Sequence, residues 1–255
     1  MHHADAIPFE QGLAVWFDAS LPLDLASLAS VRRCAVELLA AHGRIHLLVN
    51  NASVMATPFG RTEDGFELQL ATNHLGHFLL TCLLAPALRA AAPARGVNLS
   101  SGGHMISDID WEDPNFERRS YEPWIAYGQS KTANVLFTVE LEHRLTGCGV
   151  HAFAVHPGMI RTDLGRHLTK ADSAALKAMA KDAPAGGGFP AFKTIPEGAA
   201  TSVWAATAPE LAQRGGTYLA DCGISGEHAP WATDPEAARR LWMLSEQLVG
   251  KTFAP

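Results

Sequence analysis

The residues best suited to chemistry are Tyr127 and Lys131, in the segment Tyr127-Gly-Gln-Ser-Lys131. Residues four apart on a helix share a face, so the phenol and the ammonium can point into one site. A tyrosine with an ordinary pKa of ~10 is a poor acid or base at neutral pH, but a nearby cation favours its phenolate. We therefore expect Lys131 to lower the pKa of Tyr127, and a fall of ~3 would take about 4 kcal/mol. The spacing alone is more typical of a solvated helix face.

Three further polar motifs each follow a predicted strand. In chain order they are Asn50-Asn51-Ala52-Ser53 after a strand at 45–49, Val97-Asn98-Leu99-Ser100-Ser101, whose first three residues form a strand, and His156-Pro157-Gly158-Met159-Ile160-Arg161-Thr162 after a strand at 150–155. Ligands of open α/β sheets bind beyond the carboxyl ends of the strands. The three motifs therefore predict one binding edge, which turn chemistry alone does not explain.

The elements that position these motifs alternate along the chain. Hydrophobic periodicity and capping residues predict helices at 27–42, from near Thr62 to Pro86, at 124–145, at 196–206 and from Pro235 to Gly250, and a further strand at 217–220. The short apolar strands suit a sheet that is covered on both faces. This order predicts the α/β class, with a Rossmann-like open parallel sheet and helices on both faces. We expect a single domain over 1–255, with a substrate lid at 166–195.

Composition excludes several function classes. Of the 255 residues, 47% are hydrophobic and 18% are charged, with a net charge of −6, so disorder is not expected. No Lys/Arg cluster indicates nucleic acid, and no apolar stretch approaches the ~20 residues of a membrane span. No signal peptide and no paired cysteines are evident, so a cytoplasmic protein with reduced thiols is expected. The spacing of His74, His77, His104 and His156 matches no metal-ligand pattern, and we expect no metal.

Taken together, the ordered motifs strongly resemble the short-chain dehydrogenase/reductase family. Thr72-Asn73-His74-Leu75-Gly76-His77-Phe78 stands between the first two motifs described above, and the likeness extends from Leu23 to the C-terminus. The long gap between Ser101 and Tyr127 resembles the retinol-dehydrogenase-like branch. The resemblance implies an oxidoreductase that interconverts an alcohol and a carbonyl with NAD(H) or NADP(H). The alanine, methionine, phenylalanine and leucine content of 166–195 favours an apolar substrate, and the family resemblance makes a homo-oligomer an expectation.

The resemblance also implies roles for individual residues. Tyr127 would exchange a proton with the substrate oxygen, Lys131 would lower the tyrosine's pKa and hold the nicotinamide ribose, and Ser101 would hydrogen-bond the reacting oxygen. Asn73 would anchor a water relay behind Lys131. Besides Tyr127 and Lys131, the cofactor-binding residues implied are Asp24, Leu25, Asn50, Ala52, Ser53, Pro157, Gly158, Ile160 and Thr162.

The sequence departs from the family at its beginning. The family's glycine-rich phosphate-binding turn is missing ahead of Leu23-Asp24-Leu25, so residues 1–22 are atypical and the fold is expected to be N-terminally truncated. An inactive fragment or interaction protein that has lost this turn, or a misassigned start, stays open. The residue that selects NAD or NADP lies in the missing region, so both cofactors stay open. Ser53 replaces the glycine of the family's NNAG and could crowd the adenosine ribose.

Truncation would leave the strand at 45–49 without a neighbour on one side. Unpaired backbone groups cost roughly 1–3 kcal/mol each if they are buried. One hypothesis is that the apolar run Leu13–Phe17 fills the vacant place. The alternative is that Leu21–Leu25 pairs directly with this strand.

Overall fold

A computed structural model describes residues 21–172, 174 and 192–253. Its sheet has the order β1-β2-β3-β4-β5, with β1 at Leu47–Asn50, β2 at Ala94–Leu99, β3 at Val150–His156, β4 at Tyr218–Ala220 and β5 at Gly223–Ile224. The pairs from β1 to β4 are parallel, and β5 is antiparallel to β4. Because the first four strands run the same way, their carboxyl ends share one edge of the sheet.

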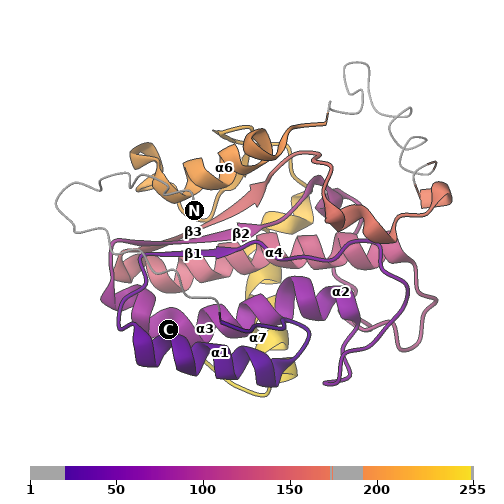
Figure 1. The fold of residues 1–255 in the computed structure, drawn as a ribbon, viewed down its shortest axis with the longest axis horizontal. Helices are drawn as coiled ribbons and strands as arrows, with labels where there is room; N and C mark the ends of the chain where they lie inside the picture. The colour runs from indigo at the N-terminus through magenta and orange to yellow at the C-terminus, as the bar shows by residue number, and fades with distance from the viewer. Residues whose placement is uncertain (1–20, 173, 175–191, 254–255) are drawn as a thin grey trace.

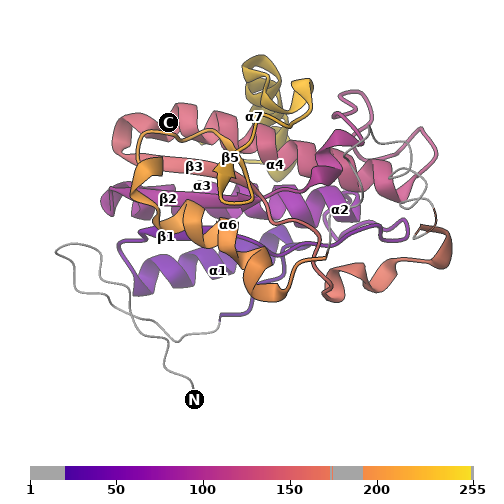
Figure 2. The same cartoon turned by 90° about the horizontal axis from the view of Figure 1, so that it is seen from above.

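Helices cover both faces of the sheet. The α-helices are α1 (Leu28–Ala41), α2 (Leu68–Leu70), α3 (Gly76–Ala90), α4 (Pro123–Leu145), α6 (Ile195–Thr207) and α7 (Pro235–Val249). In Figure 1, α6 lies on one side of the strands and α1, α3, α4 and α7 lie on the other, and α6 crosses in front of the sheet in Figure 2. The predicted α/β architecture, an open sheet with helices on both faces, is confirmed.

Each face of the sheet has its own apolar core. The larger core joins the sheet to α1, α3, α4 and α7 and includes Phe78, Leu136 and Trp242. The smaller core lies under α6 and includes Phe153 and Leu219. Burial of side chains of this size contributes roughly 1.5–3 kcal/mol each. These cores hold the strand ends, and the loops after them, in fixed positions.

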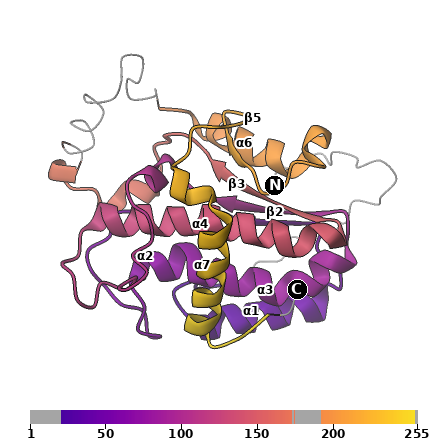
Figure 3. The same ribbon diagram turned by 180° about the vertical axis from the view of Figure 1, so that it is seen from behind.

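The C-terminal helix α7 forms as the sequence predicts. Asp234 accepts hydrogen bonds from the Glu236 and Ala237 backbone amides at its start, and Gly250 adopts φ 65° after its end. Figure 3 shows α7 crossing α4 and α3 steeply. There Trp242 meets Phe78 with ring centroids 5.0 Å apart, and Phe137 with centroids 6.0 Å apart. The helix therefore supports the side of α4 that faces away from the sheet.

The helix predicted from near Thr62 begins later, at Leu68, so that boundary is wrong. Glu63 and Asp64 do not form a first turn of their own. Ser27 donates a hydrogen bond to Glu63, and the Leu28 amide donates to Asp64 at 2.9 Å. These carboxylates therefore satisfy the start of α1. Pro86 lies inside α3 and does not end it.

The described N-terminal residues decide one of the two hypotheses about the sheet edge. Residues 21–24 form no strand, and β1 pairs with β2 alone among the described strands, so pairing of Leu21–Leu25 with β1 is wrong. Along β1, Leu47 is 43% exposed and Val49 is 42% exposed. Leu13–Phe17 and residues 175–191 of the predicted lid lie outside the described residues.

Candidate active site

Helix α4 is fastened to the carboxyl end of β2 by its own polar side chains. The Ser100 hydroxyl donates to the Lys131 carbonyl at 2.9 Å. The Asn134 amide nitrogen donates to the Leu99 carbonyl at 2.9 Å. Both contacts are buried, where an unmade hydrogen bond is costly. They fix the N-terminal half of α4, which carries Tyr127 and Lys131, against the edge where the strands end.

Tyr127 and Ser101 meet at this edge, as the sequence predicts. The Tyr127 side chain is 4% exposed, and its ring and the Ser101 hydroxyl both lie beside Gly103. Ser101 accepts the Gly103 amide at 3.1 Å. A side chain at Gly103 would put a Cβ atom 2.6 Å from the Tyr127 ring. The glycine therefore lets the Ser101 loop approach the ring, and the two hydroxyls can share one oxygen atom of a substrate.

Burial shifts the pKa of Tyr127 against our expectation. Removing the phenol from water raises its pKa to about 12, and the nearby Ser101 hydroxyl acts in the opposite direction. Lys131 Nζ lies 5.6 Å from the centre of the tyrosine ring. The net fall in pKa that we expect from the lysine is not found in this structure, because desolvation of the buried phenolate dominates. Tyr127 is thus a protonated acid at neutral pH.

Lys131 is buried and hydrogen-bonded within the protein. Its ammonium donates to the Ser53 hydroxyl at 2.8 Å and to the Leu99 carbonyl at 3.2 Å. Burial lowers its pKa to about 7. Because an ammonium has three donors, one N–H remains for a ligand beside the phenol.

Asn73 lies in a π-helical turn, Ala71–Leu75, that separates α2 from α3. Such turns are frequent at functional sites because they re-aim a side chain. The carboxamide donates to Ser130 at 2.9 Å and accepts the Val54 amide at 2.8 Å. The Asn73 carbonyl lies 3.0 Å from His77 Nδ1. Asn73, Ser53 and Lys131 thus form one group, joined to the α4 helix through Ser130.

The other residues that the resemblance assigns to the cofactor do not all present side chains at the site. Asn50 is buried and donates to Thr81 at 2.9 Å and to Asn98 at 2.7 Å, inside the protein. Asp24 is exposed and accepts the Ala26 amide. Leu25 packs its backbone against Gly76.

The motif after β3 leads away from the sheet. Pro157, Gly158 and Ile160 are half-buried there, and Gly158 has φ 86°. Ile160 pairs with Lys193 in a parallel bridge. Thr162 is exposed and accepts the Leu164 amide, and Ala52 is also exposed. The Lys193 side chain packs over Gly158, where a Cβ atom would lie 2.8 Å from it.

Two of the histidines that we interpret from the sequence as structural, and not as metal ligands, support the Ser101 loop. His104 is fully buried; its Nδ1 lies 2.6 Å from the Ser101 carbonyl and its Nε2 accepts the Ala229 amide at 3.1 Å. His156 Nδ1 accepts the Gly102 amide at 3.1 Å. Burial lowers the pKa of both rings. The sequence signal for this role is their position: His104 lies three residues after Ser101, and His156 is the first residue of the polar motif that ends at Thr162. Over the described ranges, no group of three potential metal ligands is found.

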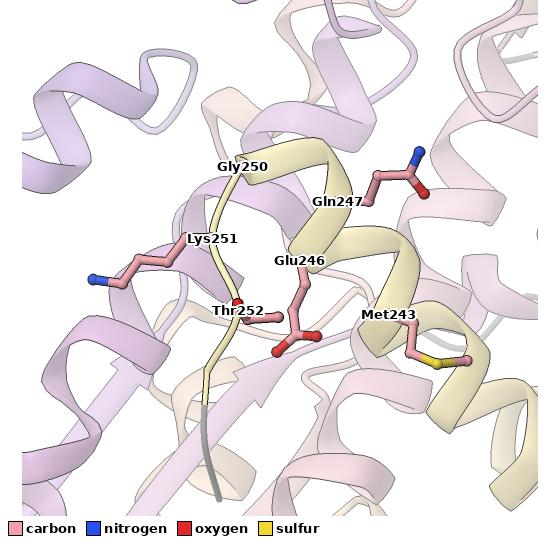
Figure 4. Close-up of a pocket in the computed structure, with 6 residues that line it drawn as sticks. All are labelled: Met243, Glu246, Gln247, Gly250, Lys251 and Thr252. Atoms are coloured by element: carbon pink, nitrogen blue, oxygen red, sulfur yellow. The ribbon is translucent and has the colours of Figure 1, made fainter.

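Hollows elsewhere on the molecule do not include these residues. One, of about 350 Å³, is lined by Met243, Glu246, Gln247, Gly250, Lys251 and Thr252 at the end of α7 (Figure 4). A neighbouring hollow of about 310 Å³ lies where α3, α4 and the C-terminal segment meet, beside Trp242 and Phe253. Neither contains a residue of the Tyr127 group.

The donor set of the site fits the nicotinamide ribose half of a dinucleotide. Lys131 keeps one N–H for a ribose hydroxyl, and Tyr127 lies beside it. Among the helices that the structure describes, none is long and apolar enough to cross a membrane.

The chain is similar in sequence to known proteins over most of its length. Residues 5–225 match the family described as enoyl-(acyl carrier protein) reductase. Retinol dehydrogenase 13 of Mus musculus is 47% identical over 234 residues, which span 91% of this chain and 68% of that protein.

Solved structures give a similar result. An uncharacterized protein from Mycobacterium paratuberculosis is 36% identical with a TM-score of 0.64, covering 91% of this chain and 76% of its own. The RhlG/NADP active-site complex of Pseudomonas aeruginosa is 28% identical with a TM-score of 0.56, over 78% of this chain and 73% of its own. The second of these carries NADP in its site.

Proposed function

This chain belongs to the short-chain dehydrogenase/reductase family, a family of oxidoreductases, and from that premise we propose that it interconverts an apolar alcohol and its carbonyl with NAD(H) or NADP(H). The observation that carries the proposal is the placement of the Tyr127 ring against the Ser101 loop and beside the buried Lys131. A bound nicotinamide would supply the hydride chemistry. The protein's residues supply orientation and the proton.

Tyr127 is the proposed proton donor. The phenol is protonated at neutral pH, so in the reduction direction it has a proton to give to a carbonyl oxygen. Ser101 would hydrogen-bond the same oxygen and hold it against the phenol. As the proton leaves, the Lys131 ammonium would stabilise the phenolate that forms, since a nearby cation favours the charged phenol.

Two large apolar side chains, one in the loop after β2 and one ahead of α6, are exposed to solvent. Met105, four residues after Ser101, is 55% exposed, and Phe192 is 53% exposed. Arg161 lies 4.7 Å from the centre of the Phe192 ring. The similarity to a retinol dehydrogenase makes a retinoid or another long apolar aldehyde the first substrate class to test.

The test is oxidation of NADH and NADPH, followed by absorbance, with retinaldehyde and with a small polar aldehyde. We expect the apolar aldehyde to be reduced faster, and Tyr127→Phe to lower kcat by ~10²–10⁴-fold, the range of acid–base catalysis. Tyr121→Phe is the matched control, because that phenol bonds Thr57 and Gln69 instead.

Two results would count against the proposal. Turnover by Tyr127→Phe at most of the normal rate would remove Tyr127 as the proton donor. If neither NADH nor NADPH binds, the result would instead favour an inactive member of the family.

A further inference from the structure

The Ser53 hydroxyl lies between the Lys131 ammonium and the Asn73 carboxamide. Its oxygen is 2.8 Å from Lys131 Nζ and 2.9 Å from Asn73 Oδ1. An ammonium can only donate, so Ser53 must accept from Lys131. The serine proton is then free for Asn73 Oδ1, which can only accept.

The direction of these bonds is fixed by the Asn73 carboxamide. Its Oδ1 accepts the Val54 amide at 2.8 Å, and its Nδ2 donates to the Val54 carbonyl at 2.9 Å. If the carboxamide were flipped, its NH2 group would face the Val54 N–H and its oxygen would face the Val54 carbonyl, and neither pair could hydrogen-bond. Nδ2 also donates to Ser130, whose hydroxyl donates to the Tyr127 carbonyl at 2.8 Å. The orientation of Ser53 is therefore set by backbone groups on both sides.

Resting on the function proposed above, we propose that Ser53 is a positioning residue of the reaction, whose hydroxyl holds the Lys131 ammonium beside the phenol and ties it to Asn73. The sequence alone predicts only that this side chain crowds the ribose, whereas the structure gives it contacts with Lys131 and Asn73. A family member with glycine at this position has no side-chain oxygen to offer, so this contact is particular to chains with a hydroxyl here.

The charge of Lys131 depends on this contact. Within the described residues, two titratable groups face the ammonium: Tyr127 on its own helix, and His77 on α3, whose pKa the Lys131 charge helps to lower. Neither compensates a buried positive charge. The two oxygen acceptors, on Ser53 and Leu99, favour the protonated lysine because hydrogen bonds donated by a charged ammonium are stronger than those donated by a neutral amine.

The test is a ¹³C NMR titration of the free protein labelled at lysine Cε, with the Lys131 signal identified by its loss in Lys131→Arg. In Ser53→Ala, which removes one acceptor, we expect the pKa of Lys131 to fall by about one, a tenfold change in its protonation equilibrium. Ser53→Thr keeps the hydroxyl and should titrate like the wild type. Ser202→Ala, at a half-buried position of α6, is the matched control for loss of a serine hydroxyl elsewhere.

The outcomes separate this inference from the proposed function. A Lys131 pKa unchanged in Ser53→Ala, or lowered as much in Ser53→Thr as in Ser53→Ala, would overturn the role of the Ser53 hydroxyl. The titration needs neither cofactor nor substrate, so it reads Ser53 even if the protein proves inactive. In an active protein, the high-pH limb of dinucleotide binding should move to lower pH in Ser53→Ala alone.

Discussion

Burial of Lys131 makes a prediction about stability that is independent of activity. Its pKa is lowered to about 7 in the folded protein, whereas an unfolded lysine titrates near 10.4. Between these two values the unfolded chain binds more protons than the folded protein, so the free energy of unfolding rises with pH. Integrated from about pH 7 to about pH 9, the lysine contributes a gain of about 2.3 kcal/mol.

Lys131→Met removes the charge and keeps a side chain of similar length. The variant should lack this gain, so the wild type should become more stable relative to it by about 2.3 kcal/mol between these two pH values. Comparing the change with pH, rather than stability at one pH, cancels the lost contacts with Ser53 and Leu99. Tyr127 does not interfere, because its pKa of about 12 lies above the range.

The assay is urea denaturation of both proteins at the two pH values, followed by circular dichroism. Lys170→Met, at an exposed position, is the control and should follow the wild type at both. A difference between wild type and Lys131→Met that changes by less than about 0.5 kcal/mol across this range would refute the reasoning, since it would mean that the folded lysine keeps its ordinary pKa.

Two glycine substitutions test the packing around the site. Gly76→Ala would place a Cβ atom 2.5 Å from the Leu25 carbonyl oxygen, so it should lower the free energy of unfolding by ~1–3 kcal/mol, although alanine normally stabilises a helix. Gly147→Ala, with open space around it, is the control in the same denaturation assay. An increase in the stability of Gly76→Ala would contradict this prediction. Gly103→Ala should displace the Tyr127 ring and lower kcat at least about tenfold while dinucleotide affinity, measured by fluorescence titration, stays the same; an unchanged kcat would show that the ring position is not critical.

The parts of the fold that the sequence predicts well are those set by local residues. Asp234, Pro235 and Gly250 mark both ends of α7 correctly. The apolar strands at 97–99 and 150–155 form within β2 and β3. By contrast, Glu63 and Asp64 have the composition of a first helical turn but bind the start of α1. That contact joins residues 36 positions apart, and a local pattern does not contain it.

For the site too, the sequence predicts the local features and misses those that depend on burial and on contacts between distant residues. The i, i+4 spacing places Tyr127 and Lys131 together, and the polar ends of parallel strands bring Ser101 to them. The direction of the Tyr127 pKa depends on how completely the phenol is buried, which spacing does not reveal. The role of Ser53 depends on the π-helical turn that aims Asn73 toward it. A sequence pattern with a period of 3.6 residues does not predict that turn.

The central claim is that this edge of the sheet holds a reduced nicotinamide dinucleotide against Tyr127 and Lys131. Calorimetric titration of the protein with NADH and with NADPH tests it most directly. We predict saturable binding of at least one of them with a Kd below about 1 mM, corresponding to more than about 4.1 kcal/mol, and weaker binding by Lys131→Met. Absence of binding heat for both at millimolar concentration, or equal affinity in Lys131→Met, would contradict the claim.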